Sequence, residues 1–383
     1  MNPSFDRLRR KLLLQGLALS CAGAAPVLAA QTVQSPESAG RRILRPRTLA
    51  FPADHGSHND ARTEWWYLTG WLRDEAQRLH GFQVTFFRSR VDPAQGLKSR
   101  LAARQLLFAH AALTDVAGRA HWHDQALARW NGEPAAWPIP QASAAVHDTD
   151  VRLRGWQLQR QADDGAYLTA IRARDFALML DATPTQPLLL QGELGWSRKG
   201  PRPEQASHYY SQPQLRVSGK IQQGQRRLKV QGRAWLDHEW SEELLHPEAV
   251  GWDWIGMNLD DGASLTAFRL RRADGSALWA GGSWRSAKGG PARIFQPHEI
   301  AFEPLRHWTS PGTGIRYPVE WRITTPAGRF VVASLLDAQE LDSRRSTGAI
   351  YWEGLSELRS ADGGSRLGLG YLELTGYGAR LAL

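Results

Sequence analysis

Short runs in which apolar and polar residues alternate dominate the chain beyond residue 50. This period of two is typical of β-strands with one buried face, and it recurs in residues 81–88, 151–154, 214–219 and 329–332. Asp-Gly turn signals separate many such runs, whereas long amphipathic helical patterns are scarce. Residues 241–248 are predicted to form a short helix. The pattern therefore predicts an all-β fold built as sandwiches or barrels.

The chain is too long for one compact core. With 383 residues it has the length of two domains, which we place at residues 51–240 and 241–383. A faint internal repeat supports this division. Residues 65–88 and 252–269 both contain an aromatic strand, an acidic turn and a strand that returns to Thr-x-Phe-Arg. The repeat predicts duplicated β-domains, and chance matching of two aromatic strands is the alternative.

The first 30 residues have the layout of an export signal. A basic head precedes an apolar stretch over residues 12–25, and small residues surround a cleavage point near Ala29 or Ala30. The basic head, Arg9-Arg10-Lys11, resembles the twin-arginine pattern that exports folded proteins. We therefore expect a signal peptide over 1–30, a polar leader over 31–50, and a protein of the periplasm or the exterior. A buried N-terminal helix is the alternative.

The single cysteine, Cys21, lies inside the predicted signal. It is either a small residue of that signal or, in a weak lipoprotein motif, a lipidated N-terminus that would tie the protein to a membrane surface. Neither case provides a disulfide framework, so the fold depends on its core. No stretch approaches the roughly 20 apolar residues that a membrane-spanning helix needs.

The chain contains 17 tryptophans, which is unusual for an ordinary β core. Clustered Trp rings suit a wide cavity that packs against a flat or polyunsaturated ligand, or against a developing cation. The filling of two ordinary cores is the alternative. The expected partner is therefore a hydrophobic small molecule. The net charge of +9 comes with arginines spread along the chain, which argues against nucleic-acid binding.

The segment from Gly232 to Ser241 carries the strongest candidate for chemistry. Asp237, His238 and Glu239 follow one another inside an aromatic strand, where ionisable side chains are costly to bury. Strand alternation places His238 and Trp240 on one face and the two carboxyl groups on the other. We predict a catalytic role for all four residues. A buried ion-pair network that fastens two domains is the alternative.

A second candidate is Asp253, which stands between Trp252 and Trp254. Apolar surroundings would raise the pKa of its carboxyl group and make it a proton donor, whereas the alternative is a buried Asp that caps a turn. A third is the polar segment before Trp65, where His55 and His58 are treated as ordinary loop residues rather than metal ligands. No nucleophile elbow, zinc-protease motif, phosphate loop or dinucleotide fingerprint occurs, so no cofactor is predicted.

Several Trp-rich motifs resemble those of one family. They are residues 62–70, 232–240, 251–254, 351–354 and 372–377, and together they are similar to the carotenoid 1,2-hydratase (hydroxyneurosporene synthase) family and its AttH-type secreted relatives. The resemblance implies two tandem lipocalin-like β-barrels. It also implies a ligand-binding set, which comprises Glu64, Trp65, Trp66, Tyr67, Trp252, Trp254, Tyr351 and Trp352.

The family resemblance also implies a chemistry. Its hydratases add water to a terminal C=C bond of an isoprenoid without a redox cofactor, and related members cyclise hydrophobic polyketides. A His and a Trp two residues apart, with a downstream Asp, form their suspected catalytic set. His238 and Trp240 match the first two, and Asp253, Asp260 or Asp261 would supply the third.

Two functions follow as expectations. The first is a cofactor-free hydratase or hydrolase that acts on an isoprenoid, fatty acyl or polyketide-like ligand. The second is a non-catalytic periplasmic lipid carrier or chaperone that serves an export system, such as an ABC transporter.

Overall fold

The computed structural model describes residues 44–99, 101–133, 141–243 and 245–380. The predicted signal peptide and most of the predicted leader lie outside these residues. These described residues form one compact unit. It is built from β-strands and three short 3-10 helices, Ala53–His55 (η1), Asp92–Ala94 (η2) and Pro297–Glu299 (η3). The prediction of an all-β fold is confirmed.

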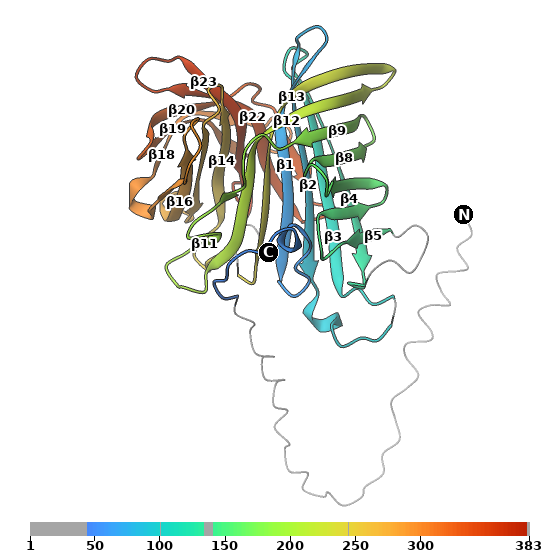
Figure 1. The fold of residues 1–383 in the computed structure, drawn as a ribbon. Helices are drawn as coiled ribbons and strands as arrows, with labels where there is room; N and C mark the ends of the chain where they lie inside the picture. The colour runs from blue at the N-terminus through green and yellow to red at the C-terminus, as the bar shows by residue number, and fades with distance from the viewer. Residues whose placement is uncertain (1–43, 100, 134–140, 244, 381–383) are drawn as a thin grey trace, which may run out of the picture. The chain divides into compact units, whose positions relative to one another are not determined.

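The first half of the chain forms a thirteen-stranded antiparallel sheet in the order β4-β3-β2-β1-β13-β12-β9-β8-β7-β6-β5, with β10 and β11 paired to β12. Its edge strands β4 and β5 contact each other, so the sheet curls into a near-barrel, called barrel 1 here (Figure 1). Its strands are β1 (Thr63–Asp74), β2 (Leu79–Arg90), β3 (Gln105–Asp115), β4 (Ala120–Trp130), β5 (Ala142–Ala144), β6 (Asp150–Leu153), β7 (Trp156–Arg160), β8 (Tyr167–Arg172), β9 (Ala177–Thr183), β10 (Leu189–Leu190), β11 (Trp196–Arg198), β12 (Ala206–Gln223) and β13 (Arg226–Ser241).

The second half forms a ten-stranded sheet in the order β17-β16-β15-β14-β23-β22-β20-β19-β18, with β21 paired to β22. It curves as a half-barrel, called sheet 2 here (Figure 1). Its strands are β14 (Gly251–Leu259), β15 (Ser264–Arg271), β16 (Ala277–Arg285), β17 (Arg293–Phe295), β18 (Ala301–Thr309), β19 (Arg316–Thr325), β20 (Gly328–Ser334), β21 (Glu340–Ser343), β22 (Ala349–Ser360) and β23 (Arg366–Leu374). The two sheets fit the tandem lipocalin-like architecture that the resemblance implies.

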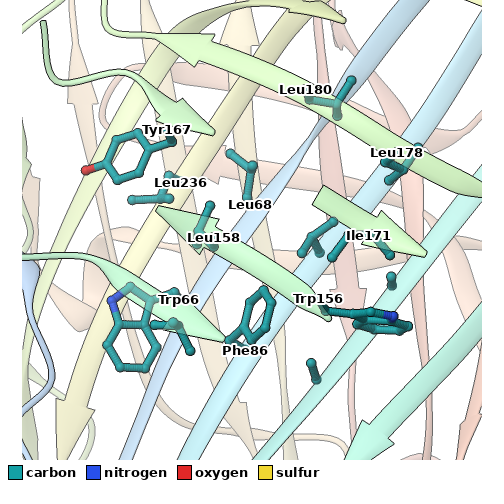
Figure 2. Packing of buried hydrophobic residues seen from close by; sticks show 14 of the residues in the cluster. Trp66, Leu68, Phe86, Trp156, Leu158, Tyr167, Ile171, Leu178, Leu180 and Leu236 are labelled. Carbon is teal, nitrogen blue, oxygen red and sulfur yellow. The ribbon is translucent and has the colours of Figure 1, made fainter. Parts of the chain in front are cut away.

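Successive side chains of a strand point to opposite faces, and this alternation decides which residues fill the interior of barrel 1. Trp66 and Leu68 of β1, Phe86 of β2 and Leu236 of β13 point inward and pack together (Figure 2). Their neighbours along the same strands point outward, toward sheet 2. Strands β1 and β13 of barrel 1 contact β23 and β14 of sheet 2, so the outer face of barrel 1 is itself covered. This double burial explains why the middle of β1 and the second half of β13 are buried on both faces.

The two repeated segments form equivalent hairpins, β1–β2 and β14–β15. Glu64 pairs with Arg88 across the first hairpin, and Asp253 pairs with Arg269 across the second. The repeat read from the sequence therefore corresponds to two hairpins of the same register. Whether the two halves fold as separate domains with a boundary at residue 240 stays a prediction.

The predicted helix over residues 241–248 is wrong for the residues described there. Ser241 still belongs to β13, and the residues described between it and β14 form bends and one turn. Pro247 has no backbone N–H to donate within a helix, and the segment serves as the connection between the two sheets. No helix in the described part of the chain is long and apolar enough to cross a membrane.

Candidate functional site

A cavity of about 330 Å³ lies between the outer face of barrel 1 and sheet 2. Residues of β1, β2, β3 and β13 form one wall, and residues of β14, β15, β22 and β23 form the other. Nine aromatic side chains give the lining its apolar character: Trp65, Tyr67, Phe87, Phe108, Tyr209, Trp252, Trp254, Phe268 and Tyr351. The size and the apolar lining suit a small organic molecule.

The two walls present the same pattern at equivalent positions. In barrel 1, Trp65 lies between Glu239 on β13 and Phe87 on β2. In sheet 2, Trp254 lies between Glu373 on β23 and Phe268 on β15. All six residues line the cavity. The duplicated hairpins therefore place one tryptophan and one carboxyl group on each side of it.

Asp237 lies on the barrel 1 wall and accepts hydrogen bonds from three buried donors. Its Oδ2 accepts a hydrogen bond from the Tyr209 hydroxyl (2.7 Å), and its Oδ1 accepts from Ser211 (2.5 Å) and from the Trp235 indole (2.6 Å). Burial raises the pKa of Asp237 to about 7, although these three donors lower it. At neutral pH this carboxyl group is therefore poised between acid and base.

Glu239 lies two residues further along the same face and is paired with a buried cation, Lys199. Lys199 Nζ lies 3.0 Å from its Oε1, and Ser207 also donates to that oxygen. The ammonium group lies over the rings of Tyr209 and Phe268, at 4.6 and 4.2 Å from their centroids. The barrel 1 wall thus holds Glu239 in a buried, charge-assisted salt bridge.

The sheet 2 wall carries two carboxyl groups without a cation between them. Glu353 and Glu373 are cross-strand partners on β22 and β23, and both line the cavity. Burial raises the pKa of Glu353 well above its usual range, and repulsion from Glu373 raises it further. Burial also raises the pKa of Glu373. This pair holds at least one proton at neutral pH, as close carboxyl pairs do.

Two polar atoms of the cavity wall have no hydrogen-bond partner among the described residues. They are the Tyr67 hydroxyl and Glu353 Oε2. An unpaired buried polar group costs about 1–3 kcal/mol, so such atoms need a ligand or an ordered water to satisfy them. They mark the part of the cavity where a polar group of a ligand would lie.

Sequence reasoning missed several of these residues. Glu353 belongs to a motif quoted for the family resemblance, and alternation along β22 would have placed it on the same face as Tyr351. Lys199 lies in a loop directly after β11, and no sequence pattern connects it with Glu239. The same holds for His110, whose Nδ1 lies 2.6 Å from the Tyr351 hydroxyl at the cavity wall.

Of the predicted catalytic residues, His238 and Trp240 point away from this cavity, into barrel 1. His238 is buried, with Nε2 3.0 Å from Glu64 Oε1 and Nδ1 3.1 Å from the Tyr210 hydroxyl. Trp240 stacks on His58 with ring centroids 3.6 Å apart. Asp237 and Glu239 face the cavity instead, as strand alternation predicts. The four residues therefore belong to two separate sites on opposite faces of β13.

Glu64 is the centre of the polar cluster inside barrel 1. Arg88 Nε donates to its Oε2 (2.7 Å), and His58 Nδ1 lies 2.7 Å from its Oε1. Burial disfavours the charged form of Glu64, but Arg88, His238 and His58 together hold its pKa well below the usual value. Glu64 borders the cavity as well, yet its carboxylate is directed into the barrel.

The prediction for Asp253 requires correction. It is buried, but it faces the side of sheet 2 away from the cavity, where Arg269 Nε lies 2.7 Å from Oδ2 and the Tyr377 hydroxyl donates to Oδ1 (2.8 Å). It is the partner of a buried ion pair and is not brought together with His238 and Trp240. The other proposed acids, Asp260 and Asp261, lie in the exposed turn after β14.

The predicted ligand-binding residues divide in the same way. Trp65, Tyr67, Trp252, Trp254 and Tyr351 line the cavity. Trp66 and Trp352 instead pack inside barrel 1 and in the core of sheet 2, respectively. Neighbours along a strand point to opposite faces, so motifs of consecutive aromatic residues could not all contribute to one site.

Comparisons with known proteins agree with this architecture. A model of the AttH-like family matches residues 42–377. A crystal structure of an AttH protein from Nitrosomonas europaea superposes with a TM-score of 0.79 at 46% sequence identity, and the match covers 88% of this chain and 99% of that one. No curated protein sequence matches the chain.

Two further solved structures share the fold at low sequence identity. Kievitone hydratase from Nectria haematococca has a TM-score of 0.63 at 13% identity, over 87% of this chain and 94% of its own. CghA has a TM-score of 0.51 at 12% identity, over 83% and 89%. The fold and the cavity define a protein of two lipocalin-like units. The chain belongs to the AttH-like family.

Proposed function

We propose that the cavity between barrel 1 and sheet 2 binds a neutral, largely apolar small molecule and adds water to it by acid catalysis. The observation that carries this proposal is that two buried polar atoms of a largely apolar cavity wall, Glu353 Oε2 and the Tyr67 hydroxyl oxygen, have no hydrogen-bond partner among the described residues. A hydroxyl or carbonyl group on an isoprenoid or polycyclic ligand would satisfy both.

The charges of the lining favour a neutral ligand. Asp237, Glu239, Glu353 and Glu373 all border the cavity, and the ammonium group of Lys199 is already paired with Glu239. The other charged pair of the lining, Glu64 with Arg88, is likewise closed. A carboxylate or phosphate headgroup would therefore meet buried acids without a free cation. This argues for an isoprenoid-like or polyketide-like ligand over a fatty acid anion.

The mechanism requires a carboxyl group that is still protonated at neutral pH, a place for a cation and a base. The protonated Glu353–Glu373 pair donates H⁺ to one carbon of a C=C bond and becomes an anion, which leaves a carbocation on the other carbon. The faces of Trp65 and Trp254 stabilise that charge. Water attacks the cation, and the proton it loses passes to a cavity carboxylate such as Asp237, so the net change is the addition of one water. Apolar walls keep other nucleophiles out.

The structural neighbours support this class of chemistry without identifying a substrate. One is named as a hydratase, kievitone hydratase. Another, CghA, has been crystallised with the compound Sch210972. Both have the two-unit fold of this chain, and the shared fold alone does not transfer their substrates.

The class of ligand is tested by measuring binding in a fluorescence titration. Titration with uncharged isoprenoid alcohols should quench the fluorescence of Trp65, Trp252 and Trp254 in the cavity. Trp254→Phe should weaken both the quenching and the affinity, whereas Trp352→Phe, in the core of sheet 2, should change neither. Tighter binding of fatty acid anions than of the uncharged alcohols of equal length would contradict the neutral-ligand proposal.

Catalysis is tested with isotope-labelled water. Incubation of the protein with a panel of neutral prenylated alkenes in H₂¹⁸O should give products that carry one labelled hydroxyl group, detected by mass spectrometry. Glu353→Gln should abolish the label while binding by Trp quenching persists. Binding without incorporation in the wild-type protein would favour the alternative, a lipid carrier. We also propose export by the N-terminal signal, which sequencing of the mature N-terminus would test.

A further inference from the structure

The polar cluster inside barrel 1 brings two histidines and an arginine around one buried carboxylate, that of Glu64. We propose that His58, Glu64 and His238 bind a divalent transition-metal ion, with Zn²⁺ as the reference ion. The site lies on the inner face of β1 and β13, opposite the cavity, so this inference is independent of the chemistry proposed there.

Three donor atoms of the appropriate chemistry converge on one point. His58 Nδ1 lies 2.7 Å and His238 Nε2 lies 3.0 Å from Glu64 Oε1, and the three atoms all fall within 4.8 Å of one another. Two imidazole nitrogens and one carboxylate oxygen are a common ligand set for zinc and for non-haem iron. A four-coordinate ion with bond lengths of about 2.0–2.1 Å holds its ligand atoms roughly 3.3–3.4 Å apart, so binding requires the two nitrogens to move away from Glu64 Oε1 by about 0.3–0.7 Å.

Each ligand is oriented by a partner on its far side. Asp54 Oδ1 lies 2.9 Å from His58 Nε2, the Tyr210 hydroxyl lies 3.1 Å from His238 Nδ1, and Arg88 holds the second oxygen of Glu64. Metal-binding histidines typically use their other nitrogen in this way, toward a carboxylate or another polar group. Asp54 is in turn held by Arg47 at 2.7 Å.

The two rings are also fixed by stacking. His58 lies parallel to the Trp240 indole, with centroids 3.6 Å apart and planes 6° apart. His238 stacks on Trp66 at 4.7 Å and 22°. Both tryptophans belong to the core of barrel 1. The donors are therefore held in position before an ion arrives, which is the condition for tight binding.

Sheet 2 provides an internal comparison. Its equivalent ion pair, Asp253 with Arg269, has Leu372 and Leu374 on β23 where barrel 1 has His238 and Trp240 on β13. Tyr377 and Arg271 close the remaining side of Asp253. Among the described residues, the imidazole donors thus accompany only one of two otherwise equivalent carboxylate–arginine pairs.

The experiment uses the purified protein after removal of metal with a chelator. Equilibrium dialysis against Zn²⁺ should yield one ion per chain, and Co²⁺ should produce the visible absorption of a histidine-ligated ion. Glu64→Gln and His58→Gln should each weaken binding by 100-fold or more. Asp54→Asn should weaken it about 10–100-fold, as loss of an orienting partner does. Asp253→Asn should leave it unchanged.

Folding is checked separately by circular dichroism, and His58→Gln is the gentlest variant because His58 lies in a loop at the edge of the barrel. Zn²⁺ should raise the melting temperature of the wild-type protein and not that of the His58→Gln variant. Absence of stoichiometric binding at micromolar Zn²⁺, or equal binding by the wild type and the folded variants, would overturn the proposal and leave a hydrogen-bonded network alone.

Discussion

The two walls of the cavity occupy equivalent places in barrel 1 and sheet 2, yet they surround their carboxyl groups with different partners. Glu239 and Glu373 stand beside equivalent tryptophans. Their next cross-strand neighbours differ, since Tyr209 lies beside Glu239 and Glu353 lies beside Glu373. Lys199 forms a buried salt bridge with Glu239, whereas Glu373 has a second buried carboxyl group, that of Glu353, as its cross-strand neighbour. Duplication thus supplied the geometry, and single neighbouring residues decided the chemistry.

The same contrast holds on the inner faces. Glu64–Arg88 and Asp253–Arg269 occupy the same register in their hairpins, with N–O distances of 2.7 Å in both. The first pair is surrounded by histidines, and the second by a tyrosine and a further arginine. The first pair belongs to a cluster with three groups that could ligate a metal ion, His58, Glu64 and His238. The second is an ion pair whose carboxylate makes ion pairs and hydrogen bonds only with Arg269, Arg271 and Tyr377 among the described side chains.

The largest expected effect distinguishes these two ion pairs. Glu64→Ala should lower the free energy of unfolding by about 3–5 kcal/mol, because it leaves the fully buried Arg88 guanidinium without an anion. Asp253→Ala should cost less, since the Arg269 side chain is 11% exposed and also lies over the Trp321 ring. Urea unfolding of both variants measures the difference. Equal losses would show that the two pairs are energetically equivalent.

The next effect concerns Asp237, which stands where sheet 2 has Tyr371. Its folded-state pKa of about 7 lies above the unfolded value, so its contribution to stability is present below about pH 4 and is lost as the pH rises through 7. Relative to Asp237→Asn, the wild-type protein should therefore lose up to about 4 kcal/mol between pH 4 and pH 8. Thermal unfolding across this range tests it, and a constant difference between the two proteins would contradict the raised pKa.

A smaller effect is expected when barrel 1 is made to resemble sheet 2. His238→Leu introduces the residue that sheet 2 has at the equivalent position, Leu372. Glu64 would lose one charged hydrogen bond but keep Arg88 and His58, so the cost should be about 1.5–3 kcal/mol. Urea unfolding in the presence of a chelator provides the measurement. A loss as large as that of Glu64→Ala would mean that the histidine, rather than Arg88, stabilises the carboxylate.

The smallest effect is expected at the surface. Arg329 and Asp362 form an ion pair with side chains that are 60% and 72% exposed. Arg329→Ala should therefore change the free energy of unfolding by less than about 1 kcal/mol, and less still in high salt. This variant is the control for the buried ion pairs. If Arg329→Ala lowered the free energy of unfolding as much as Glu64→Ala does, the loss at Glu64 could not be attributed to the burial of its ion pair.

Much of the fold and part of the site followed from local patterns. Alternation along 234–240 was enough to separate His238 and Trp240 from Asp237 and Glu239, since side chains on a strand point to alternate faces. The Thr-x-Phe-Arg repeat likewise identified the two equivalent hairpins. The role of Asp253 was misjudged because two flanking tryptophans indicate an apolar setting but not which cation lies across the strand pair. That cation is Arg269, sixteen residues further along the chain, which forms an ion pair with Asp253.

By itself, the sequence determined the β-strands, their turns, the duplicated hairpins and the faces on which the acids of β13 lie, because all of these depend on neighbours within one strand or hairpin. Only the tertiary structure decided that Glu239 meets Lys199, that Glu353 and Glu373 share one wall, and that His58 and His238 converge on Glu64. These contacts join residues from distant strands and loops. Their pairing depends on how the sheets curl and pack, which no local period of the sequence encodes.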